Sequence, residues 1–536
     1  MAKSKIAIFS GANTTIANSL PLITSNKGRL PGERTLPGSF DHLVPQLLYE
    51  PVIVKIKKFS AHPLESDASD VYQDNDGKDY YEVTLRPEDG LYLLPYMARR
   101  KDGSPSGRPF ESSDLSDPNV DFGGRQFFYP DASRIFDEID RTIFGRGVEG
   151  EGNALNKRAE YEFLRVIPAG GFTKKGEIAG IDFFPYRPEA KAKVTRVRDL
   201  AKVANVVQKE MSSEKYVGGL WLDGSPQLEE TLYWLNLMID TDLPIVGTSS
   251  QRPHGQLSND GDRNIVDAVD YILSGKGKGL GAVALLDQRI YAAREVKKGD
   301  SRPGGYKATG GHGGILGGIG QADSGRSAIT IWYLPNYKRA SSSDVNLTRL
   351  PGELTFPDSI NGAEISIRIK NEDGYLIPES LPVVDIIKYG SYSQESEKED
   401  PKNELVITSL VKRAVDDQTQ KVSGRPKLHG IILEGSGGLA KGTRSQMKAL
   451  ATASMSGIPV VRVLRSDPEG KVATNPKDLT IEGSNLDANK ARLLLIACLL
   501  KLGRLPRATS PENPNSRELE AVIERIARFQ ELFETH

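Results

Sequence analysis

The chain has 536 residues, with 70 Lys and Arg against 71 Asp and Glu and a formal net charge of −1. At typical domain sizes this length predicts about three domains or two enlarged ones, with enough residues to build buried cores. The balanced charge and the lack of a long basic run disfavour nucleic acid and membrane surfaces as partners.

In the first part of the chain, short apolar runs end in Gly, Ser or Thr turns and lead into helical periodicity. This pattern is typical of parallel βα units. The N-terminus has no apolar signal segment before the first run, so a cytoplasmic location is expected. The runs predict strands at residues 5–9, 52–56, 216–222, 243–247 and 281–286. Apolar residues on one face predict helices over 228–239 and 265–272. We therefore expect a doubly wound α/β domain with a mainly parallel sheet.

The βα rhythm is lost between about residue 70 and residue 193, where Asp, Gly, Pro and aromatic residues dominate. Apolar segments inside this region predict an ordered insertion and not a linker. Alternation at 364–369 predicts a connector with its own strands over 340–382. The expected organisation is therefore an N-terminal domain over 1–339 with an insertion at about 70–193, the connector, and a smaller domain over 383–536.

The predicted C-terminal domain again has the α/β pattern. Its expected strands are residues 383–387, 430–433 and 458–463, and its expected helices begin at Ser445 and cover 487–502 and 516–533. The single cysteine, Cys498, excludes an internal disulfide framework. Because it lies in the apolar run 493–500, it is predicted to be buried. That run is too short to span a bilayer.

Small and hydroxyl-bearing residues follow three of the predicted strands. These turns are Ser10-Gly-Ala-Asn-Thr-Thr-Ile-Ala17, the cluster at 62–67, and the segment at 222–231. Each alone also fits an ordinary turn or a helix cap. At the carboxyl ends of strands in an open α/β sheet, however, backbone N–H groups are available and ligands bind. Three such turns in succession favour a ligand site.

In their order along the chain, these motifs resemble those of the asparaginase/glutaminase family of amidohydrolases. The first, second and third family motifs match residues 10–17, 65–67 and 223–231, and further matches lie at 246–253, 258–261, 292–298, 430–437, 457–461 and 485–492. The resemblance covers roughly residues 1–67, 194–335 and 383–505. It implies two asparaginase-like α/β domains, with a large insertion in the N-terminal one.

The resemblance also implies a chemistry. In this family a Thr hydroxyl attacks an amide, ammonia leaves, and water releases the acid from the acyl-enzyme. A Thr hydroxyl is a weak nucleophile that needs a neighbouring base or charge. The matching positions are Thr15 for the nucleophile, Ser225 for the second catalytic hydroxyl and Lys298 for the amine that tunes it. Without the resemblance, Lys298 would be read as a solvated lysine beside Lys297.

The residues implied for substrate binding show how the chain departs from the family pattern. Ser66 and Asp67 would hold the substrate's α-substituents, and backbone N–H groups around Gly224 would stabilise the oxyanion. Pro226 replaces the family Asp that engages the α-amino group, and proline offers neither charge nor N–H. Asp223 replaces the family His, and either supplies a displaced carboxylate or, as we favour, caps the turn. The substrate is therefore expected to be a small amide other than, or as well as, asparagine.

Three functions remain open at this stage. The first is an asparaginase-like amidohydrolase, the second a ring-opening hydrolase of a cyclic amide or imide, and the third a non-catalytic small-molecule-binding protein on the same fold. No metal or other cofactor is predicted, because the six histidines show no ligand spacing. The family resemblance implies a homodimer or homotetramer, in which the small domain of one subunit closes the neighbour's site.

Overall fold

The structure is a computed structural model. It describes the strands before residue 196 and, with gaps, residues 196–536. The gaps are residues 226, 253–259, 310, 322–326, 336–346, 360–361, 363, 390–406, 420–427, 437, 466–471 and 473–477.

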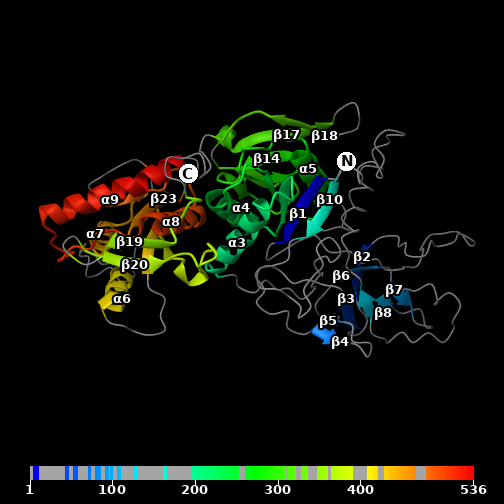
Figure 1. Ribbon diagram of the computed structural model, residues 1–536, viewed down its shortest axis with the longest axis horizontal. Helices are drawn as coiled ribbons and strands as arrows, with labels where there is room; N and C mark the ends of the chain where they lie inside the picture. The colour runs from blue at the N-terminus through cyan, green and yellow to red at the C-terminus, as the bar shows by residue number, and fades with distance from the viewer. Residues whose placement is uncertain are drawn as a thin grey trace, which may run out of the picture.

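The largest sheet has eight strands (Figure 1). In spatial order they are β10 (Tyr161–Arg165), β1 (Ser4–Ser10), β11 (Gly218–Leu222), β12 (Ile245–Thr248), β13 (Ala282–Leu286), β14 (Arg289–Ala292), β17 (Ile315–Gln321) and β18 (Ser327–Ile331). The first five run parallel, and the last three add an antiparallel edge. Four of the five strands predicted from the N-terminal half are thereby confirmed.

Helices cover both faces of this sheet, as the doubly wound pattern predicts. Phe9 and Trp221 pack with α3 (Asp199–Met211) and α4 (Gln227–Met238), whereas Ile6 and Leu220 pack with α5 (Gly261–Leu273). Alternate residues of each strand therefore point to opposite helical layers. Gly247 allows α4 to pack this closely on β12. A Cβ atom at this position would lie 2.5 Å from the Leu232 side chain of α4, which is closer than two non-bonded carbon atoms can approach.

One predicted strand lies in a different sheet. Residues 52–56 fall in β3 (Val52–Lys57), which belongs to a four-stranded sheet with β4 (Val71–Gln73), β5 (Asp79–Leu85) and β9 (Gln126–Phe128). The prediction that this run is the second strand of the doubly wound sheet is wrong. Its lysines alternate with apolar residues, which suits an antiparallel pairing such as the one it makes with β5. The position beside β1 is taken by β10, which lies within the region predicted as an insertion.

Two small strand pairs complete the description before residue 196. β2 (Leu43–Leu47) pairs with β6 (Leu91–Pro95), and β7 (Met97–Arg99) pairs with β8 (Pro105–Pro109). Both pairs are antiparallel.

The C-terminal part of the chain forms a second, fully parallel sheet (Figure 1). Its strands are β21 (Val383–Lys388), β22 (Leu428–Gly435), β23 (Val460–Leu464) and β24 (Ile481–Glu482), and its helices are α6 (Ile407–Thr419), α7 (Arg444–Met455), α8 (Ala488–Leu502) and α9 (Ser516–Thr535). The predicted strands and helices of this region are confirmed. The antiparallel pair of β19 (Glu353–Pro357) and β20 (Glu364–Arg368) confirms that the connector has strands of its own, as its alternating apolar and polar residues predicted.

Helix α8 is the element that joins the two sheets. It is apolar around almost its whole circumference, as expected of a helix buried on all sides. It packs on α4, which covers the first sheet, and on β21 and β22 of the second, and Cys498 in its C-terminal half is fully buried, as predicted. Asp487 caps its N-terminus by accepting a hydrogen bond from the backbone N–H of Lys490.

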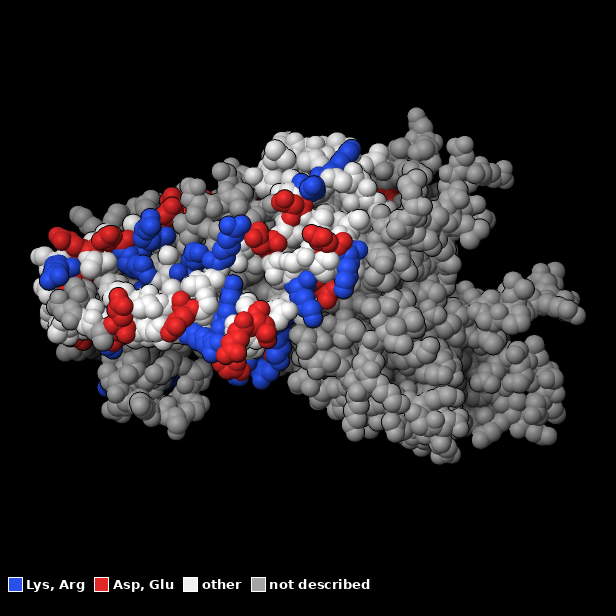
Figure 2. Space-filling model, in the orientation of Figure 1, with Lys and Arg blue, Asp and Glu red and all other residues white. Residues whose placement is uncertain are grey.

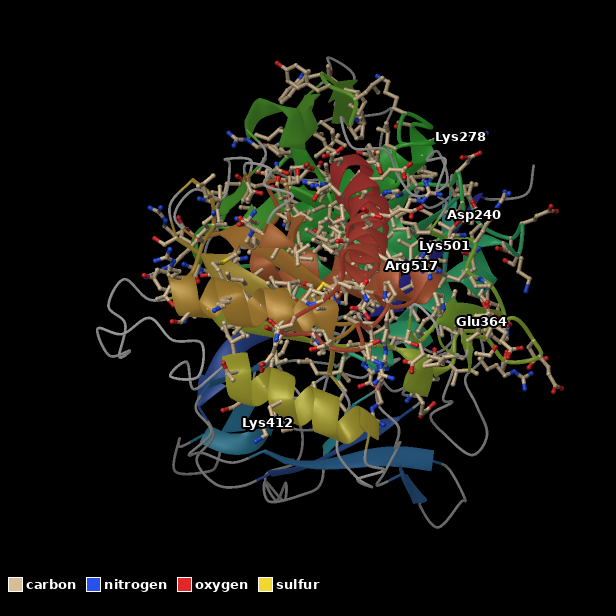
Figure 3. All side chains as sticks on the ribbon, turned by 90° about the vertical axis from the view of Figure 1, so that its left-hand side faces the viewer. Asp240, Lys278, Glu364, Lys412, Lys501 and Arg517 are labelled. Atoms are coloured by element: carbon tan, nitrogen blue, oxygen red, sulfur yellow. The ribbon has the colours of Figure 1, made fainter. Side chains whose placement is uncertain are left out.

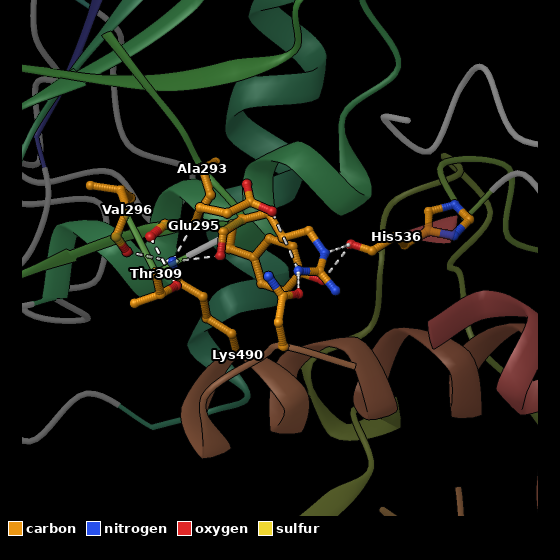
Figure 4. Close-up of polar contacts among 9 residues, drawn as sticks. Ala293, Glu295, Val296, Thr309, Lys490 and His536 are labelled. Atoms are coloured by element: carbon orange, nitrogen blue, oxygen red, sulfur yellow. Dashed lines mark hydrogen bonds and ion pairs between the residues drawn. The ribbon is translucent and has the colours of Figure 1, made fainter. Parts of the chain in front are cut away.

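A buried ammonium group ties α8 to the first sheet (Figure 4). Nζ of Lys490 donates to the carbonyl oxygens of Ala293 (3.0 Å), Arg294 (2.9 Å) and Val296 (2.5 Å). The first two carbonyls lie between β14 and the short strand β15 (Val296–Lys298), and the third belongs to the first residue of β15. The positive charge is also stabilised by the carboxylates of Asp487, Glu229 and Glu295. A buried cation requires such compensation, because its hydration is lost.

On the face drawn in Figure 2, the described residues form no large patch of a single charge. Basic and acidic side chains of the described residues are interspersed there over both sheets (Figure 2). Among these residues, no helix combines the length and the apolar character needed to cross a bilayer.

Replacement of Lys490 by methionine should destabilise the fold strongly. In Lys490→Met three buried carbonyl oxygens lose their ammonium donor and the nearby buried carboxylates lose one compensating positive charge, so we expect the free energy of unfolding to fall by about 3–5 kcal/mol. Urea denaturation measures this change. The matched control is Lys501→Met in the same helix, where the ammonium lies near the surface (Figure 3) and bonds one carbonyl, that of Arg349. A loss of about 1 kcal/mol or less in both variants would contradict the assignment.

Candidate active site

The topology of the eight-stranded sheet fixes where a ligand crevice forms. After β1 the chain enters this sheet next at β10, on one side of β1, whereas after β11 it enters next at β12, on the other side. A crevice opens at such a switch point, outside the carboxyl ends of the two strands. Ser10 and Leu222 are paired in register, so β1 and β11 end side by side. The residues that follow β11 are Asp223, Gly224 and Ser225.

Asp223 is part of the turn and not a free carboxylate. Its side chain is buried and accepts hydrogen bonds from the backbone N–H of Gly224 (2.8 Å) and from Nε1 of Trp221 (3.1 Å). Oγ1 of Thr231 in α4 lies 3.5 Å from the same carboxylate. These contacts favour the turn cap over the displaced catalytic carboxylate. They also engage the Gly224 N–H, so an oxyanion at this donor would have to share it with Asp223.

Ser225 stands at the start of α4, and its hydroxyl is shielded from solvent. Among the described residues, its Oγ has no hydrogen-bond partner of good geometry. The neighbouring polar group is the phenol of Tyr306, in β16 (Tyr306–Ala308), whose oxygen lies 3.4 Å from Oγ of Ser249. Burial raises the pKa of Tyr306, and interaction with the Ser225 and Ser249 hydroxyls partly offsets this rise. The Tyr306 and Ser225 hydroxyls are therefore close, without forming a well-directed bond.

Lys298 reaches the same edge of the sheet on a hairpin. It ends β15 and pairs directly with Tyr306 across the β15–β16 ladder. Its backbone N–H donates to Oε2 of Glu229 in the first turn of α4 (3.0 Å). Within the described ranges, no side chain or carbonyl hydrogen-bonds its ammonium group. Because Glu229 follows Ser225 within one helical turn, this contact fixes the hairpin over the start of α4.

Glu229 is the titratable group of this contact. Burial is the main cause that raises its pKa to about 7, and the charge of Asp487 adds to the rise. The positive charge of Lys490 and the hydrogen bond from the Lys298 backbone act in the opposite direction. The carboxyl is therefore close to half-protonated near neutral pH.

The structure thus brings Gly224, Ser225 and Lys298 to one edge of the sheet. Thr15, Ser66, Asp67 and Pro226 lie outside the described residues, and the roles expected of them stay predictions.

Sequence reasoning overlooked Tyr306, Glu229 and Ser249. Glu229 and Ser249 lie in segments that were recognised as motifs, 223–231 and 246–253, but they carried no separate signal. Tyr306 had none at all, because only the hairpin register places it beside Lys298. No cluster of side chains in the described part of the chain is suited to a metal ion.

The raised pKa of Glu229 predicts a pH-dependent stability. Between its unfolded value of 4.5 and about 7, the folded protein binds this proton more tightly than the unfolded chain. The free energy of unfolding therefore falls as pH rises through this window. In Glu229→Gln this contribution is absent, so we expect the loss between pH 5 and pH 8 to shrink by on the order of 1–3 kcal/mol.

Urea titrations at several pH values measure this difference. The surface variant Glu531→Gln, which alters an exposed carboxylate in α9, serves as the control and should keep the wild-type profile. Identical pH profiles for Glu229→Gln and wild type would show that Glu229 ionises normally.

Comparison with known proteins shows sequence similarity in the segment that carries these elements. The model of the asparaginase N-terminal domain matches residues 184–304, which include the 223–225 turn and Lys298. A glutaminase-asparaginase of Acinetobacter glutaminasificans is 31% identical over 158 residues, which are 30% of this chain and 47% of that protein. L-asparaginase 2 of Bacillus subtilis is 36% identical over 99 residues, 18% of this chain and 26% of that protein. The chain thus spans less than half the length of these curated relatives.

A solved structure described as a probable cytoplasmic L-asparaginase from Campylobacter jejuni is also similar. It shares 20% sequence identity at a TM-score of 0.46, over 70% of this chain and 92% of the other. That match is too weak to support an argument about this chain. The family model and the curated relatives together show that this chain is similar in sequence to asparaginases, with the family-model match confined to residues 184–304.

Proposed function

We propose that the protein is an amidohydrolase that cleaves a small-molecule amide through an acyl-enzyme on Thr15. The observation that carries the proposal is the meeting of the Gly224–Ser225 turn with the Lys298 hairpin at the β1–β11 switch point. The match to the asparaginase N-terminal family model supports it, since the matched segment contains both the turn and the lysine.

The proposed reaction uses groups from both strand ends. Thr15 follows β1, whose end is in register with the end of β11, so its hydroxyl is expected beside Ser225. The Thr15 oxygen attacks the amide carbon, and its proton passes through Ser225 and Lys298 to the nitrogen, which leaves as ammonia. Water then attacks the ester, giving the acid and restoring the hydroxyl.

The substrate is bound, in this proposal, by Ser66 and Asp67 and by the backbone around Gly224. Because the Gly224 N–H already bonds the Asp223 carboxylate, the oxyanion would share this donor or use the neighbouring N–H of Ser225. Pro226 cannot contact an α-amino group through its side chain or N–H. The proposed substrate class is therefore small amides, without a requirement for asparagine.

The domain organisation proposed for this activity has two α/β domains, over 1–339 and 383–536, joined by the connector 340–382. Most of the region 70–193 is proposed to be an insertion that shapes access to the site, with β10 returning to the main sheet. A homodimer or homotetramer, and a cytoplasmic location, remain part of the same proposal.

Ammonia release over a panel of amides tests the function. Thr15→Ala and Lys298→Met should each lower kcat by about 1,000-fold or more, because they remove the nucleophile and the amine. The matched control is Lys297→Met. It removes the neighbouring lysine, whose ammonium lies 3.7 Å from the Asp487 carboxylate, and should retain activity.

Two other outcomes would replace the proposal. Conversion of a cyclic amide or imide into an acid without ammonia would identify a ring-opening hydrolase. Thermal stabilisation by an amide in both wild type and Thr15→Ala, with turnover in neither, would identify a binding protein.

A further inference from the structure

The hydroxyl of Ser225 lacks a partner in the part of the chain that the structure describes. Its Oγ is shielded from solvent, yet no described group bonds it with good geometry. A buried hydroxyl left in this state is unfavourable by about 1–3 kcal/mol, so such groups are rare in folded proteins. We therefore expect a neighbouring group to hydrogen-bond the Ser225 hydroxyl at some stage of the reaction.

Tyr306 is held in place to be that group. Its backbone pairs with Lys298 in the β15–β16 hairpin, and its carbonyl oxygen accepts a hydrogen bond from the Tyr291 phenol (3.1 Å). Its ring is buried, with 4% of the residue exposed. Its hydroxyl lies 3.4 Å from Oγ of Ser249, whose own carbonyl accepts a hydrogen bond from the side chain of Asn264 (2.9 Å). These contacts hold the phenol beside the end of β12, which is paired in register with the end of β11.

The chemistry of a buried phenol suits this position. A tyrosine is neutral near pH 7 and burial raises the pKa of Tyr306 further, so its oxygen can accept one hydrogen bond while its hydrogen is donated to another group. A donor to Ser225 Oγ would leave the serine's own hydrogen directed elsewhere. The lack of a well-formed bond to Ser225 Oγ in the free protein is consistent with this, because catalytic hydrogen bonds are often loose in free enzymes and tighten in the complex.

We propose that Tyr306 is a positioning residue that donates its phenolic hydrogen to Oγ of Ser225 and thereby directs the Ser225 O–H toward the reacting groups. This inference rests on the proposed function, because it assigns Tyr306 a role at the same site. Tyr306 is not required to touch the substrate. It acts through Ser225, and its contact with Ser249 holds the phenol in line.

Removal of the hydroxyl alone tests the role during turnover. Tyr306→Phe should lower kcat by about 10- to 100-fold and change KM by less than about threefold, because the group acts on the reaction and not on binding. In a Ser225→Ala background, Tyr306→Phe should cause no further loss, since the partner is already absent. Losses that multiply in the double variant would overturn the proposal.

The matched control is Tyr271→Phe. Tyr271 lies in α5 on the opposite face of the same sheet, and its hydroxyl is also buried without a partner among the described residues. Its removal should leave kcat unchanged. A similar fall in kcat for both phenylalanine variants would show a general effect of removing a buried hydroxyl and would overturn the proposal.

A second measurement does not depend on turnover. In Ser225→Cys, the thiol at this position can be titrated by its thiolate absorbance, because Cys498 is fully buried and burial raises its pKa far out of range. A hydrogen bond from Tyr306 stabilises the thiolate, so adding Tyr306→Phe should raise the thiol pKa by about one unit. Adding Tyr271→Phe should not change it.

The two measurements separate the inference from the proposed function. If the wild type hydrolyses no amide but the thiol pKa rises with Tyr306→Phe, the proposed function fails and the contact stands. If the thiol pKa is the same with and without the Tyr306 hydroxyl, the inference is overturned, whatever the activity of the wild type.

Discussion

The candidate site depends on one buried ammonium group. Lys490 projects from α8 toward the turn before β15 and binds two carbonyl oxygens in that turn and one in the first residue of β15. That turn leads directly into Lys298, and the charge of Lys490 also acts on Glu229, which binds the Lys298 backbone. A residue separated from these carbonyls by almost 200 positions, 197 in the case of Ala293, therefore sets the position of the expected catalytic amine. The second sheet is thus part of the support of the site.

The sequence predicted the elements whose pattern is local. Strands such as β11 and β13 are buried along their whole length and stand out as apolar runs, and α4 and α5 show clear periodicity. The pairing of strands is not local, and here the prediction was wrong for β3. Nothing in its composition distinguished a strand beside β1 from one in another sheet. The antiparallel edge of β17 and β18 was missed because glycines dilute the apolar pattern of β17.

The same difference between local and non-local signals applies to the candidate site. Gly224, Ser225 and Lys298 belong to motifs that can be recognised from consecutive residues, and the structure brings them to one edge of the sheet. Tyr306 and Lys490 owe their positions to a hairpin register and to a contact between distant helices and turns. Single-sequence reasoning has no access to either. Supporting residues of this kind become visible only when the chain is folded, although they decide how tightly the reacting groups are held.

The fully buried Cys498 gives this architecture an internal reporter. It is the protein's only thiol and lies in the C-terminal half of α8, among the residues that join the two sheets. A reagent in solution can reach it only when the helix separates from its surroundings, because the folded state shields the sulfur and disfavours the thiolate. The rate of its modification therefore follows local opening of the helix that carries Lys490. The rate at which α8 separates from the candidate site can thus be measured in the native sequence, without introducing a label.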